Sequence, residues 1–362
     1  MSGTMQFTNL LQLEALAREI LDPGTFDFIA GGADDEVTLR RNREDFERIA
    51  LRPRVLVDVS NVDTSTTVLG TPVSMPVVLA PTAGHQICCS DGELATARAA
   101  TEAGILMALS TLSTFSIEEV AAVSDAPRWF QLYVYQDREV ARTLIQRAEG
   151  AGYKGICVTV DVPRIGHRER DLRNAYAFPK ELVLANLVEM QLERLPVGVV
   201  DGTGLGKYIA SKWDAALSWK DIDWFASLSS LPIIIKGILT AEDAVIAAEH
   251  GAAAVVVSNH GGRQLDSAIS SIAALPEVVE AVGDRMEVLM DGGVRRGTDV
   301  LKALALGARA VMLGRPYLYG LALGGQEGVR RVIEALGQEL ALAMALSGRP
   351  TIKDVDATLV KM

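Results

Sequence analysis

Short runs of apolar, largely β-branched residues recur along the chain, separated by segments in which apolar residues have helical spacing. Each run has the length of a strand and is bounded by glycine, proline or polar residues. The strands of a parallel sheet are covered on both faces, so they appear as continuous apolar runs instead of alternating patterns. We therefore predict eight buried strands, at residues 77–81, 105–110, 129–134, 155–161, 232–237, 253–259, 287–292 and 308–315.

The segments between these runs favour helices, and several of them end on glycine, as helix C-termini often do. Ser116 with Glu119, and Thr240 with Asp243, have the spacing of an N-cap residue and its acidic partner. Eight strands alternating with helices predict an α/β fold, a (β/α)8 TIM barrel. We place the barrel at residues 77–320, within a single domain of residues 1–362.

Two regions fall outside this repeat. Residues 1–60 have the pattern of helices that precede the barrel, and we expect them to form a helical cap. The apolar face of the first helix is predicted to consist of Leu10, Leu13, Leu16 and Ile20. The connection at 163–230, after the fourth strand, is far longer than a usual βα loop and carries glycines at 202, 204 and 206. We interpret it as a long, lid-like loop.

Composition changes the picture mainly by exclusion. The chain of 362 residues has a net charge of −11, and this acidic balance argues against nucleic acid as a partner. We find no segment typical of a signal peptide and none apolar enough to span a membrane. The three cysteines, Cys88, Cys89 and Cys157, do not have the spacing of zinc ligands or of a disulfide framework. We therefore expect a cytoplasmic protein that binds a small molecule and no metal.

Polar residues stand at the carboxyl ends of the predicted strands. In a TIM barrel these ends meet at one face, where the active site is built. The residues expected there are Thr82, Ser110, Gln131, Tyr133, Thr159, Asp161, Lys236, Ser258 and His260, with Asp291 to Arg295 and Gly314 to Arg315 after the last two strands. Together they predict one site at the mouth of the barrel.

The turns after strands seven and eight have the pattern of a phosphate site. Gly292, Gly293 and Gly314 leave backbone N–H groups open to an anion, and Arg295 and Arg315 add two guanidinium groups. This position is the usual phosphate site of a TIM barrel. The alternative is that these segments are ordinary turns with solvated arginines. A phosphate site alone would also not show whether the phosphate belongs to a cofactor or to a sugar-phosphate substrate.

His260 is a candidate general base. Its imidazole titrates near neutrality, and a carboxylate such as Asp161 would orient it and stabilise the imidazolium. The alternative is a structural histidine. Arg168 and Arg263 are placed to bind a substrate carboxylate, or else form surface ion pairs.

Lys236 ends the fifth strand, and its position leaves three interpretations open. The amine is a Schiff-base nucleophile, a fixed positive charge beside a cofactor, or a buried salt-bridge partner. The sequence alone does not choose among them.

Several segments resemble one known family. SNHGGRQLD (258–266) is similar to the signature of the FMN-dependent L-2-hydroxy acid oxidase and dehydrogenase family, which includes glycolate oxidase, lactate oxidase and mandelate dehydrogenase. The resemblance extends over nearly the whole chain, through PTA (81–83), LST (109–111), QLYVY (131–135), TVDVPRIGHRERDLRN (159–174), LPIIIKGI (231–238) and DGGVRRGTDVLKALALGA (291–308).

The resemblance implies roles for these residues. The flavin would be contacted by Pro81, Thr82, Ala83, Ser110, Gln131, Thr159 and Lys236, beside Ser258, and the FMN phosphate by Asp291, Gly292, Gly293, Arg295, Gly314 and Arg315. His260 would take a proton from the substrate, with Asp161 supporting the imidazole. The substrate would be bound by Tyr133, Arg168 and Arg263, with Phe28 and Leu112 also at its site.

Two positions and one segment depart from the family pattern. Phe28 stands where many members have a tyrosine, and Leu112 stands where glycolate oxidase carries tryptophan. These two changes lead us to expect a lactate-like or bulkier substrate, with an aromatic, mandelate-type acid included. The segment GHQICCS (84–90) is also unusual, and we interpret Cys88 and Cys89 as buried small hydrophobes.

The membrane-binding branch of the family uses an apolar insertion after the fourth strand. Here that stretch is interrupted by Glu181, Glu189, Glu193 and Arg194. We therefore expect an oxidase without membrane contact that passes electrons to oxygen and yields hydrogen peroxide. Family analogy implies a homotetramer or homo-octamer. The alternatives are a dehydrogenase with another electron acceptor, a Schiff-base sugar-phosphate aldolase, and a non-catalytic flavin-binding protein.

Overall fold

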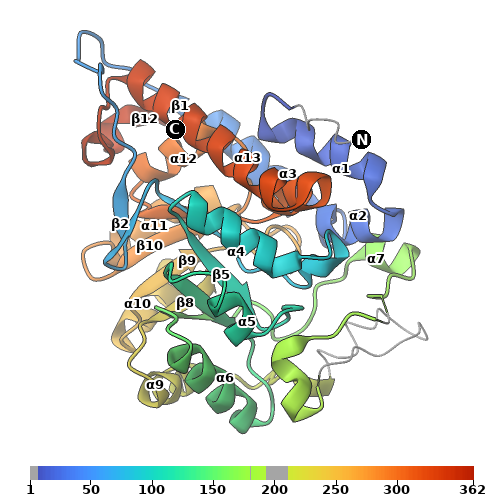
Figure 1. Ribbon diagram of the computed structural model, residues 1–362. Helices are drawn as coiled ribbons and strands as arrows, with labels where there is room; N and C mark the ends of the chain where they lie inside the picture. Colours follow the sequence, from blue (N-terminus) through green and yellow to red (C-terminus); the bar gives the residue numbers. More distant parts are fainter. Residues whose placement is uncertain (1–6, 180, 193–210) are drawn as a thin grey trace.

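The computed structural model describes residues 7–179, 181–192 and 211–362. Eight parallel strands close into a barrel in the order β10, β11, β4, β5, β6, β7, β8, β9 (Figure 1). The barrel strands are β4 (Val77–Leu79), β5 (Leu106–Ser110), β6 (Arg128–Leu132), β7 (Ile156–Thr159), β8 (Ile233–Ile238), β9 (Ala254–Val257), β10 (Glu287–Asp291) and β11 (Ala310–Leu313). Each of them falls within or beside a predicted run, so the TIM-barrel prediction is confirmed.

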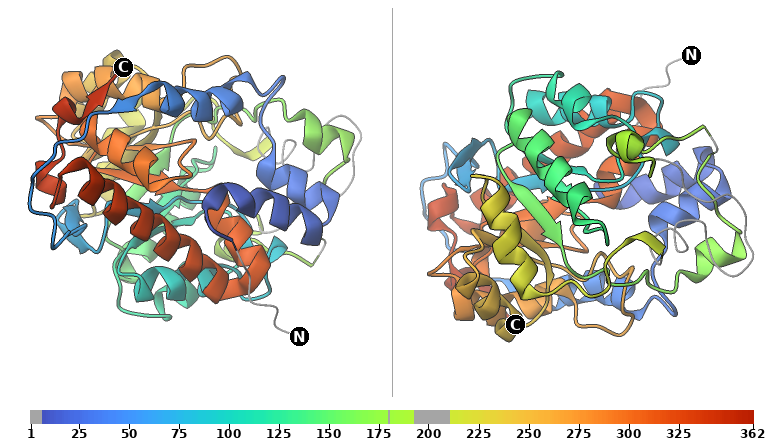
Figure 2. Two further views of the ribbon diagram at one scale, coloured as in Figure 1. Left: turned by 90° about the horizontal axis from the view of Figure 1, so that it is seen from above. Right: turned by 90° about the horizontal axis from the view of Figure 1, so that it is seen from below.

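Helices follow the strands around the outside of the barrel, as the two further views show (Figure 2). They are α4 (Gly92–Glu102), α5 (Ile117–Ala121), α6 (Arg138–Gly150), α7 (Glu169–Arg173), α9 (Trp219–Leu228), α10 (Ala241–Glu249), α11 (Ser271–Val282), α12 (Gly297–Ala305) and α13 (Arg315–Ser347). Ser116 and Glu119 form the predicted capping box of α5, and the Thr240 side chain accepts from Asp243 N at the start of α10. The helix α13 bends at Gly324 and Gly325, whose backbone dihedrals are not helical.

The interior of the barrel is filled by apolar side chains. Inward-facing residues of this core include Val78, Leu106, Trp129, Ile234 and Leu289, all fully buried. The hairpin of β2 (Thr66–Val68) and β3 (Thr71–Val73) adds two buried valines to this cluster and closes the amino end of the barrel. Because that end is closed, the chemistry is confined to the opposite, carboxyl end.

The first helices lie against the last one. They are η1 (Leu10–Gln12), α1 (Leu13–Ile20), α2 (Pro23–Ala30) and α3 (Val37–Arg48). α1 packs on α13, and the blue helices lie beside the orange-red one in Figures 1 and 2. The buried face of this region consists of Leu10, Leu13 and Ala17. Ile20 is 55% exposed, so the prediction that it belongs to this face is wrong. Ile20 is the last residue of α1, and Asp22 caps the start of α2 directly after it.

The remaining elements are short. They are β1 (Ala50–Leu51), which pairs with β12 (Val360–Lys361), and the 3-10 turns η2 (His85–Ile87), η3 (Ala185–Met190), η4 (Ile352–Asp354) and η5 (Ala357–Leu359). In the long connection after β7, Ser218 and Asp221 form a capping box at the start of α9. Its glycines at 202, 204 and 206, with Glu193 and Arg194, lie outside the described residues. Within the described ranges, no helix combines the length and the hydropathy that crossing a membrane requires.

Candidate active site

A cavity of about 160 Å³ opens at the carboxyl ends of the barrel strands. The predicted residues that line it are Phe28, Pro81, Thr82, Ala83, Ser110, Leu112, Tyr133, Arg168, Lys236, His260, Arg263, Asp291, Gly292, Gly293, Arg295, Gly314 and Arg315. The strand ends therefore converge on a single cavity, as expected. Phe28, from the α2 helix before the barrel, lines the same cavity.

Four predicted residues do not line this cavity: Gln131, Thr159, Asp161 and Ser258. Thr159 lines a second cavity instead. Gln131 donates from Nε2 to Thr159 Oγ1 at 3.0 Å and accepts from Ser110 Oγ at 3.2 Å. By accepting the hydrogen bond from Ser110 Oγ, Gln131 orients Ser110, which does line the cavity. Contact of these four side chains with a ligand stays a prediction.

His260 and Asp161 form a pair at the mouth of the barrel. His260 Nδ1 lies 2.9 Å from Asp161 Oδ1, so the proton sits on Nδ1 and Nε2 is left with its lone pair. The histidine has a left-handed backbone with φ of 58°, and its backbone N–H donates to Ser258 Oγ at 3.0 Å. Burial lowers the pKa of His260, although the Asp161 carboxylate opposes this shift. A neutral imidazole oriented by a carboxylate is suited to accept a proton.

Lys236 is held by two neighbours. Its Nζ lies 2.9 Å from Asp291 Oδ2 and donates to Ser258 Oγ at 2.9 Å, and that hydroxyl in turn donates to Asp291 Oδ1. Burial alone would lower the pKa of Lys236, but the Asp291 and Asp161 carboxylates raise it above its usual value. The amine therefore stays protonated, which disfavours the Schiff-base interpretation and fits a fixed positive charge at the cavity.

One end of the cavity is built for an anion. Gly292 and Gly293 follow β10 with φ of 91° and 85°, and a Cβ on Gly293 would lie 1.9 Å from the Asn42 carbonyl oxygen. Gly314 is the N-cap of α13, has no side chain to cap the helix, and has open space where a Cβ would be. Pro316 has no N–H and Tyr317 N donates to Gly314 O, so the Arg315 N–H is the donor at this helix start that has no side-chain acceptor. Such an N–H at a helix start is suited to an anion.

Two arginines complete this end. Burial lowers the pKa of both Arg295 and Arg315 to about 10, which shows that the two cations lack full compensation by nearby carboxylates. Arg315 donates to the carbonyl oxygens of Ile29, Gly31 and Gly261, so it also ties the end of α2 to the His260 loop. An anion between the two guanidinium groups would relieve their charge.

The predicted substrate arginines lie next to Arg315, because Arg263 and Arg315 both donate to the Gly31 carbonyl oxygen. The part of the cavity around Arg168, Arg263 and Tyr133 is called the substrate end. Arg263 donates to Gly31 O at 2.9 Å, and Arg168 Nε lies 3.4 Å from Arg263 O. Burial, together with the Arg168 charge, lowers the pKa of Arg263 to about 9. Burial also raises the pKa of Tyr133 to about 12, so its hydroxyl is a neutral donor. Two adjacent cations and a neutral donor form a site suited to a carboxylate.

Phe28 supports this end from the side. Its ring lies 5.1 Å from the Arg263 guanidinium carbon, a cation–π contact. It stacks on Tyr176 with ring centroids 5.0 Å apart and contacts Phe178 edge-on, also at 5.0 Å. Phe28 therefore joins a cluster of three aromatic rings that holds the position of Arg263.

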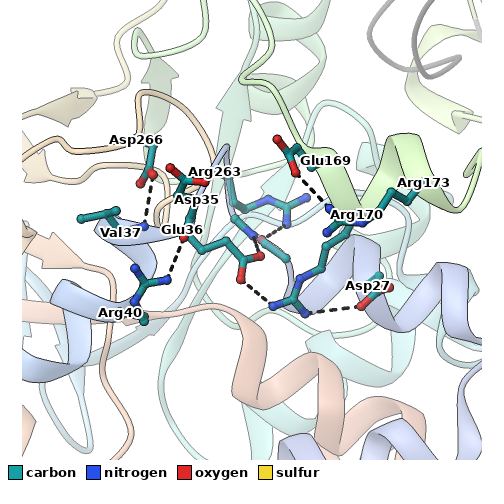
Figure 3. Close-up of polar contacts among 12 residues, drawn as sticks. Asp27, Asp35, Glu36, Val37, Arg40, Glu169, Arg170, Arg173, Arg263 and Asp266 are labelled. Atoms are coloured by element: carbon teal, nitrogen blue, oxygen red, sulfur yellow. Dashed lines mark hydrogen bonds and ion pairs between the residues drawn. The ribbon is translucent and has the colours of Figure 1, made fainter.

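Behind Arg263, polar contacts fix the α2–α3 turn (Figure 3). Arg170 contacts both Asp27 and Glu36, while Asp266 accepts from the backbone N–H groups of Val37 and Thr38 at the start of α3. The end of the SNHGGRQLD segment thus supports the loop, because Asp266 faces α3 and not the cavity.

The GHQICCS segment directly follows Thr82 and Ala83. His85 is buried and hydrogen-bonded to Thr82 and Thr96, and Glu93 accepts from His85 N. Burial raises the pKa of the Cys88 thiol to about 12. This thiol stays neutral. Cys88 and Cys89 pack against the apolar core but are only partly buried, so the prediction that both are buried is wrong.

Sequence reasoning missed several residues of the cavity wall: Ile29, Ala80, Val162, Trp213, Gly261, Met312, Leu313 and Leu318. Most are neighbours in sequence of predicted residues, so the strand-end pattern contained a signal for them. Trp213 is different, because it comes from the long connection after β7, whose irregular sequence gave no position.

These features define an enzyme of the TIM-barrel class with a glycine- and arginine-lined end suited to an anion, a fixed cation and a histidine–aspartate pair. Residues 17–362 match the family model described as FMN-dependent dehydrogenase, and the chain belongs to this family. Its cofactor is FMN.

Known relatives align with this chain over nearly its full length. The chain is 51% identical over 360 residues to "Glycolate oxidase 3" of Arabidopsis thaliana, covering 99% of this chain and 96% of the relative. It is 52% identical to "L-lactate oxidase" of Nostoc sp., covering 98% of each. Among solved structures, mandelate oxidase with (S)-4-hydroxymandelic acid has a TM-score of 0.93 and 41% identity, with 98% of each chain covered.

The cavity fits FMN on its own chemistry. A phosphate is matched by the start of α13 with Arg295 and the positive-φ glycines. The buried, protonated Lys236 lies at the same cavity, where a cation favours the negative charge that a reduced flavin gathers. The donors therefore match both ends of the cofactor.

Proposed function

We propose that the protein oxidises an L-2-hydroxy acid to the corresponding 2-oxo acid. The observation that carries this proposal is His260, which is held by Asp161 and lines the same cavity as Arg168, Arg263 and Tyr133. A base beside a carboxylate site is what removal of a proton from a 2-hydroxy acid requires.

In this proposal the substrate carboxylate is held by Arg263 and Arg168. A guanidinium binds a carboxylate through two parallel hydrogen bonds, which also fixes the orientation of the acid. The Tyr133 hydroxyl, which stays protonated, donates a third hydrogen bond to the anchored acid. The hydroxyl-bearing carbon is thereby presented to His260.

His260 accepts the substrate proton at Nε2. Asp161 Oδ1 accepts the hydrogen bond from Nδ1 and stabilises the imidazolium that forms. When bound, FMN supplies the two-electron acceptor for the substrate carbon. Lys236 supplies a fixed positive charge at the flavin ring, and Arg295, Arg315 and the start of α13 hold the phosphate.

The substrate that we propose is lactate-like or bulkier, with an aromatic, mandelate-type acid included. The non-polar wall of the cavity, with Phe28, Leu112, Val162 and Trp213, supports this choice. The names of the relatives, which include an L-lactate oxidase and a mandelate oxidase, are consistent with it.

We also propose oxygen as the electron acceptor, with hydrogen peroxide as the second product, and a homo-oligomer in the cytoplasm. The oxidase names of the relatives support the first part. Exposed apolar side chains support the homo-oligomer. Residues 54–57 lie against the end of α13, and in this region Val55, Leu56 and Leu346 are 80%, 103% and 71% exposed. Light scattering of the purified protein tests the assembly, and a monodisperse monomer would contradict it.

The function is tested by anaerobic reduction of the purified flavoprotein. L-lactate, longer aliphatic 2-hydroxy acids and (S)-mandelate are mixed with it in turn, and the flavin absorbance is followed before and after air is admitted. We expect bleaching by at least one of these acids and rapid recovery in air with peroxide formed. Bleaching without recovery would favour a dehydrogenase, and no bleaching by any acid would end the proposal.

A further inference from the structure

His85 lies in the middle of a chain of hydrogen bonds that begins at the active-site cavity. The side chain is buried, at 1% exposure. Its Nε2 lies 2.8 Å from Thr82 Oγ1, and its Nδ1 lies 3.1 Å from Thr96 Oγ1. Thr82 is partly exposed and lines the cavity. The imidazole is therefore joined to the wall of the FMN cavity by one hydroxyl group, and the proposed reaction does not use it.

The hydrogen bonds continue on both sides of the imidazole. Thr82 Oγ1 lies 2.5 Å from the Tyr317 hydroxyl, which donates to Ala80 O at 2.7 Å. A longer contact of 3.3 Å, from the Tyr317 hydroxyl to Nε2, shares the ring position that Thr82 already occupies. On the other side, Thr96 Oγ1 donates to Gly92 O at 3.3 Å. Five contacts thus join Ala80 O to Gly92 O without a break.

The protons available for these five contacts can be counted. Each contact needs one proton, and the hydroxyls of Thr82, Thr96 and Tyr317 carry one each. A neutral imidazole adds one more, so one contact is without a proton whichever tautomer is present. An imidazolium donates from both ring nitrogens and supplies the missing proton. The network is therefore complete only when His85 is protonated.

The charges around His85 decide when this happens. Glu93 on α4 is fully buried and accepts from His85 N at 3.0 Å. Burial lowers the pKa of His85, although the Glu93 carboxylate opposes this shift. The other titratable neighbours are neutral, because burial raises the pKa of Cys88 to about 12 and also raises the pKa of Tyr317 on α13. His85 is thus neutral here and stands next to one carboxylate.

Reduction of the FMN changes the charge at the cavity. A reduced flavin gathers negative charge. Lys236 also lines the cavity, but its charge is already balanced by Asp291, whose Oδ2 lies 2.9 Å from the amine. Reduction therefore adds negative charge on the cavity side of Thr82. Negative charge near an imidazole favours its protonated form.

We propose that His85 is a redox-linked proton site, which takes up one proton when the FMN is reduced and releases it when the FMN is reoxidised. In the oxidation of a 2-hydroxy acid, the substrate loses two electrons and two protons. The electrons pass to the flavin with one of these protons, and His260 accepts the other. The proton on His85 is a further one, taken from solvent through the Thr82 hydroxyl, and no electron passes to the histidine.

The test measures how many protons are taken up with each pair of electrons. The FMN-loaded enzyme is reduced electrochemically, without any hydroxy acid, from about pH 5 to about pH 8, on both sides of the ordinary histidine pKa. At a fixed potential, each proton taken up makes the ratio of reduced to oxidised FMN fall tenfold per pH unit.

Wild type is compared with His85→Gln, which keeps a hydrogen-bonding side chain but cannot take up a proton. The matched control is His250→Gln, because His250 follows α10, pairs with Asp223 and does not line the cavity. His260 is present in all of these proteins, so its own titration cancels in the comparison.

We expect the ratio to fall up to about tenfold more per pH unit in wild type than in His85→Gln, between the two pKa values of His85 with oxidised and with reduced FMN. His250→Gln should behave as wild type. Equal slopes in wild type and His85→Gln over the whole range would overturn the proposal.

Thr96→Val provides a second test if His85→Gln does not fold or does not bind FMN. It removes the oxygen that accepts from Nδ1 and so disfavours the imidazolium. The pH range with the steeper slope should therefore move to lower pH, and an unmoved range would also overturn the proposal. Because no hydroxy acid enters these measurements, failure of the proposed substrate reaction would leave their result unchanged.

Discussion

The two ends of the active-site cavity differ in whether backbone or side chains form them. The phosphate end consists of backbone: positive-φ glycines after β10 and the open N-terminus of α13, with arginines added. The substrate end consists of side chains, and several of them come from segments outside the barrel strands, such as Phe28 on α2 and Trp213 in the long connection.

This difference has a physical consequence. A backbone cradle depends on dihedral angles that a single Cβ would disturb, so its shape admits little variation. A wall of side chains can change size or polarity without moving the barrel. We infer that the phosphate end fixes the cofactor, whereas the substrate end sets which acid is oxidised, and the predictions below test this division.

The largest effect is expected at His260, which stands between the two ends. His260→Ala removes the proton acceptor and should lower the rate of flavin reduction by about 10²- to 10⁴-fold. The yellow colour should stay, because the phosphate end is untouched. Stopped-flow reduction and the FMN content measure both quantities. A variant that reduces its flavin at the wild-type rate would remove His260 from the mechanism.

The pH dependence gives a sharper test of the same pair. His260 must be neutral to act, so kcat/KM should fall as the pH drops through its pKa, which burial holds below its usual value. The Asp161 charge opposes this lowering. Asp161→Asn should therefore move the acid limb of the pH profile to lower pH while reducing the maximal rate. An acid limb that does not move would show that another group controls it.

Gly293→Ala should damage the phosphate end. The added Cβ would lie 1.9 Å from the Asn42 carbonyl oxygen, at a residue whose φ is 85°. We expect a loss of about 1–3 kcal/mol in the free energy of unfolding and weaker FMN binding. Thermal unfolding and FMN titration measure these losses. Gly150→Ala is the control, because open space surrounds its Cβ position in α6. Equal effects at both glycines would refute the idea of a tight backbone cradle.

The same division explains what could be predicted from the sequence. The eight strands were found because buried parallel strands leave continuous apolar runs, and the phosphate end was found because it follows directly from two strand ends. The contact of Phe28 with Arg263 joins residues far apart in the chain and leaves no periodic signal. Trp213 could not be placed for the same reason. Nor could sequence show that Gln131 and Asp161 do not line the cavity, because a strand position does not give side-chain depth.

Arg263→Lys tests the substrate end alone. A lysine keeps the charge but cannot form two parallel hydrogen bonds with a carboxylate. We expect the apparent Kd of the hydroxy acid to rise roughly tenfold to a hundredfold, with FMN affinity unchanged. Arg142→Lys, on the exposed surface of α6, is the control. If FMN affinity falls as much as substrate affinity, the two ends do not act separately.

Phe28→Leu should have the smallest effect of this series. It removes the cation–π contact with Arg263 and the stacking on Tyr176 but keeps an apolar wall. A contact of this kind contributes about 0.5–2 kcal/mol, so substrate affinity should fall by a few-fold to about thirtyfold.

Phe28→Tyr is the matched change, because it keeps the ring and adds a hydroxyl at the position where many family members have a tyrosine. If the ring of Phe28 acts by holding Arg263, Phe28→Tyr should bind the acid at least as tightly as wild type, and only Phe28→Leu should bind it more weakly. Titration of both oxidised variants with the 2-oxo acid product, followed by the flavin spectrum, measures this without turnover. Wild-type affinity in Phe28→Leu would show that the aromatic cluster does not support Arg263, and that the substrate end depends on its arginines alone.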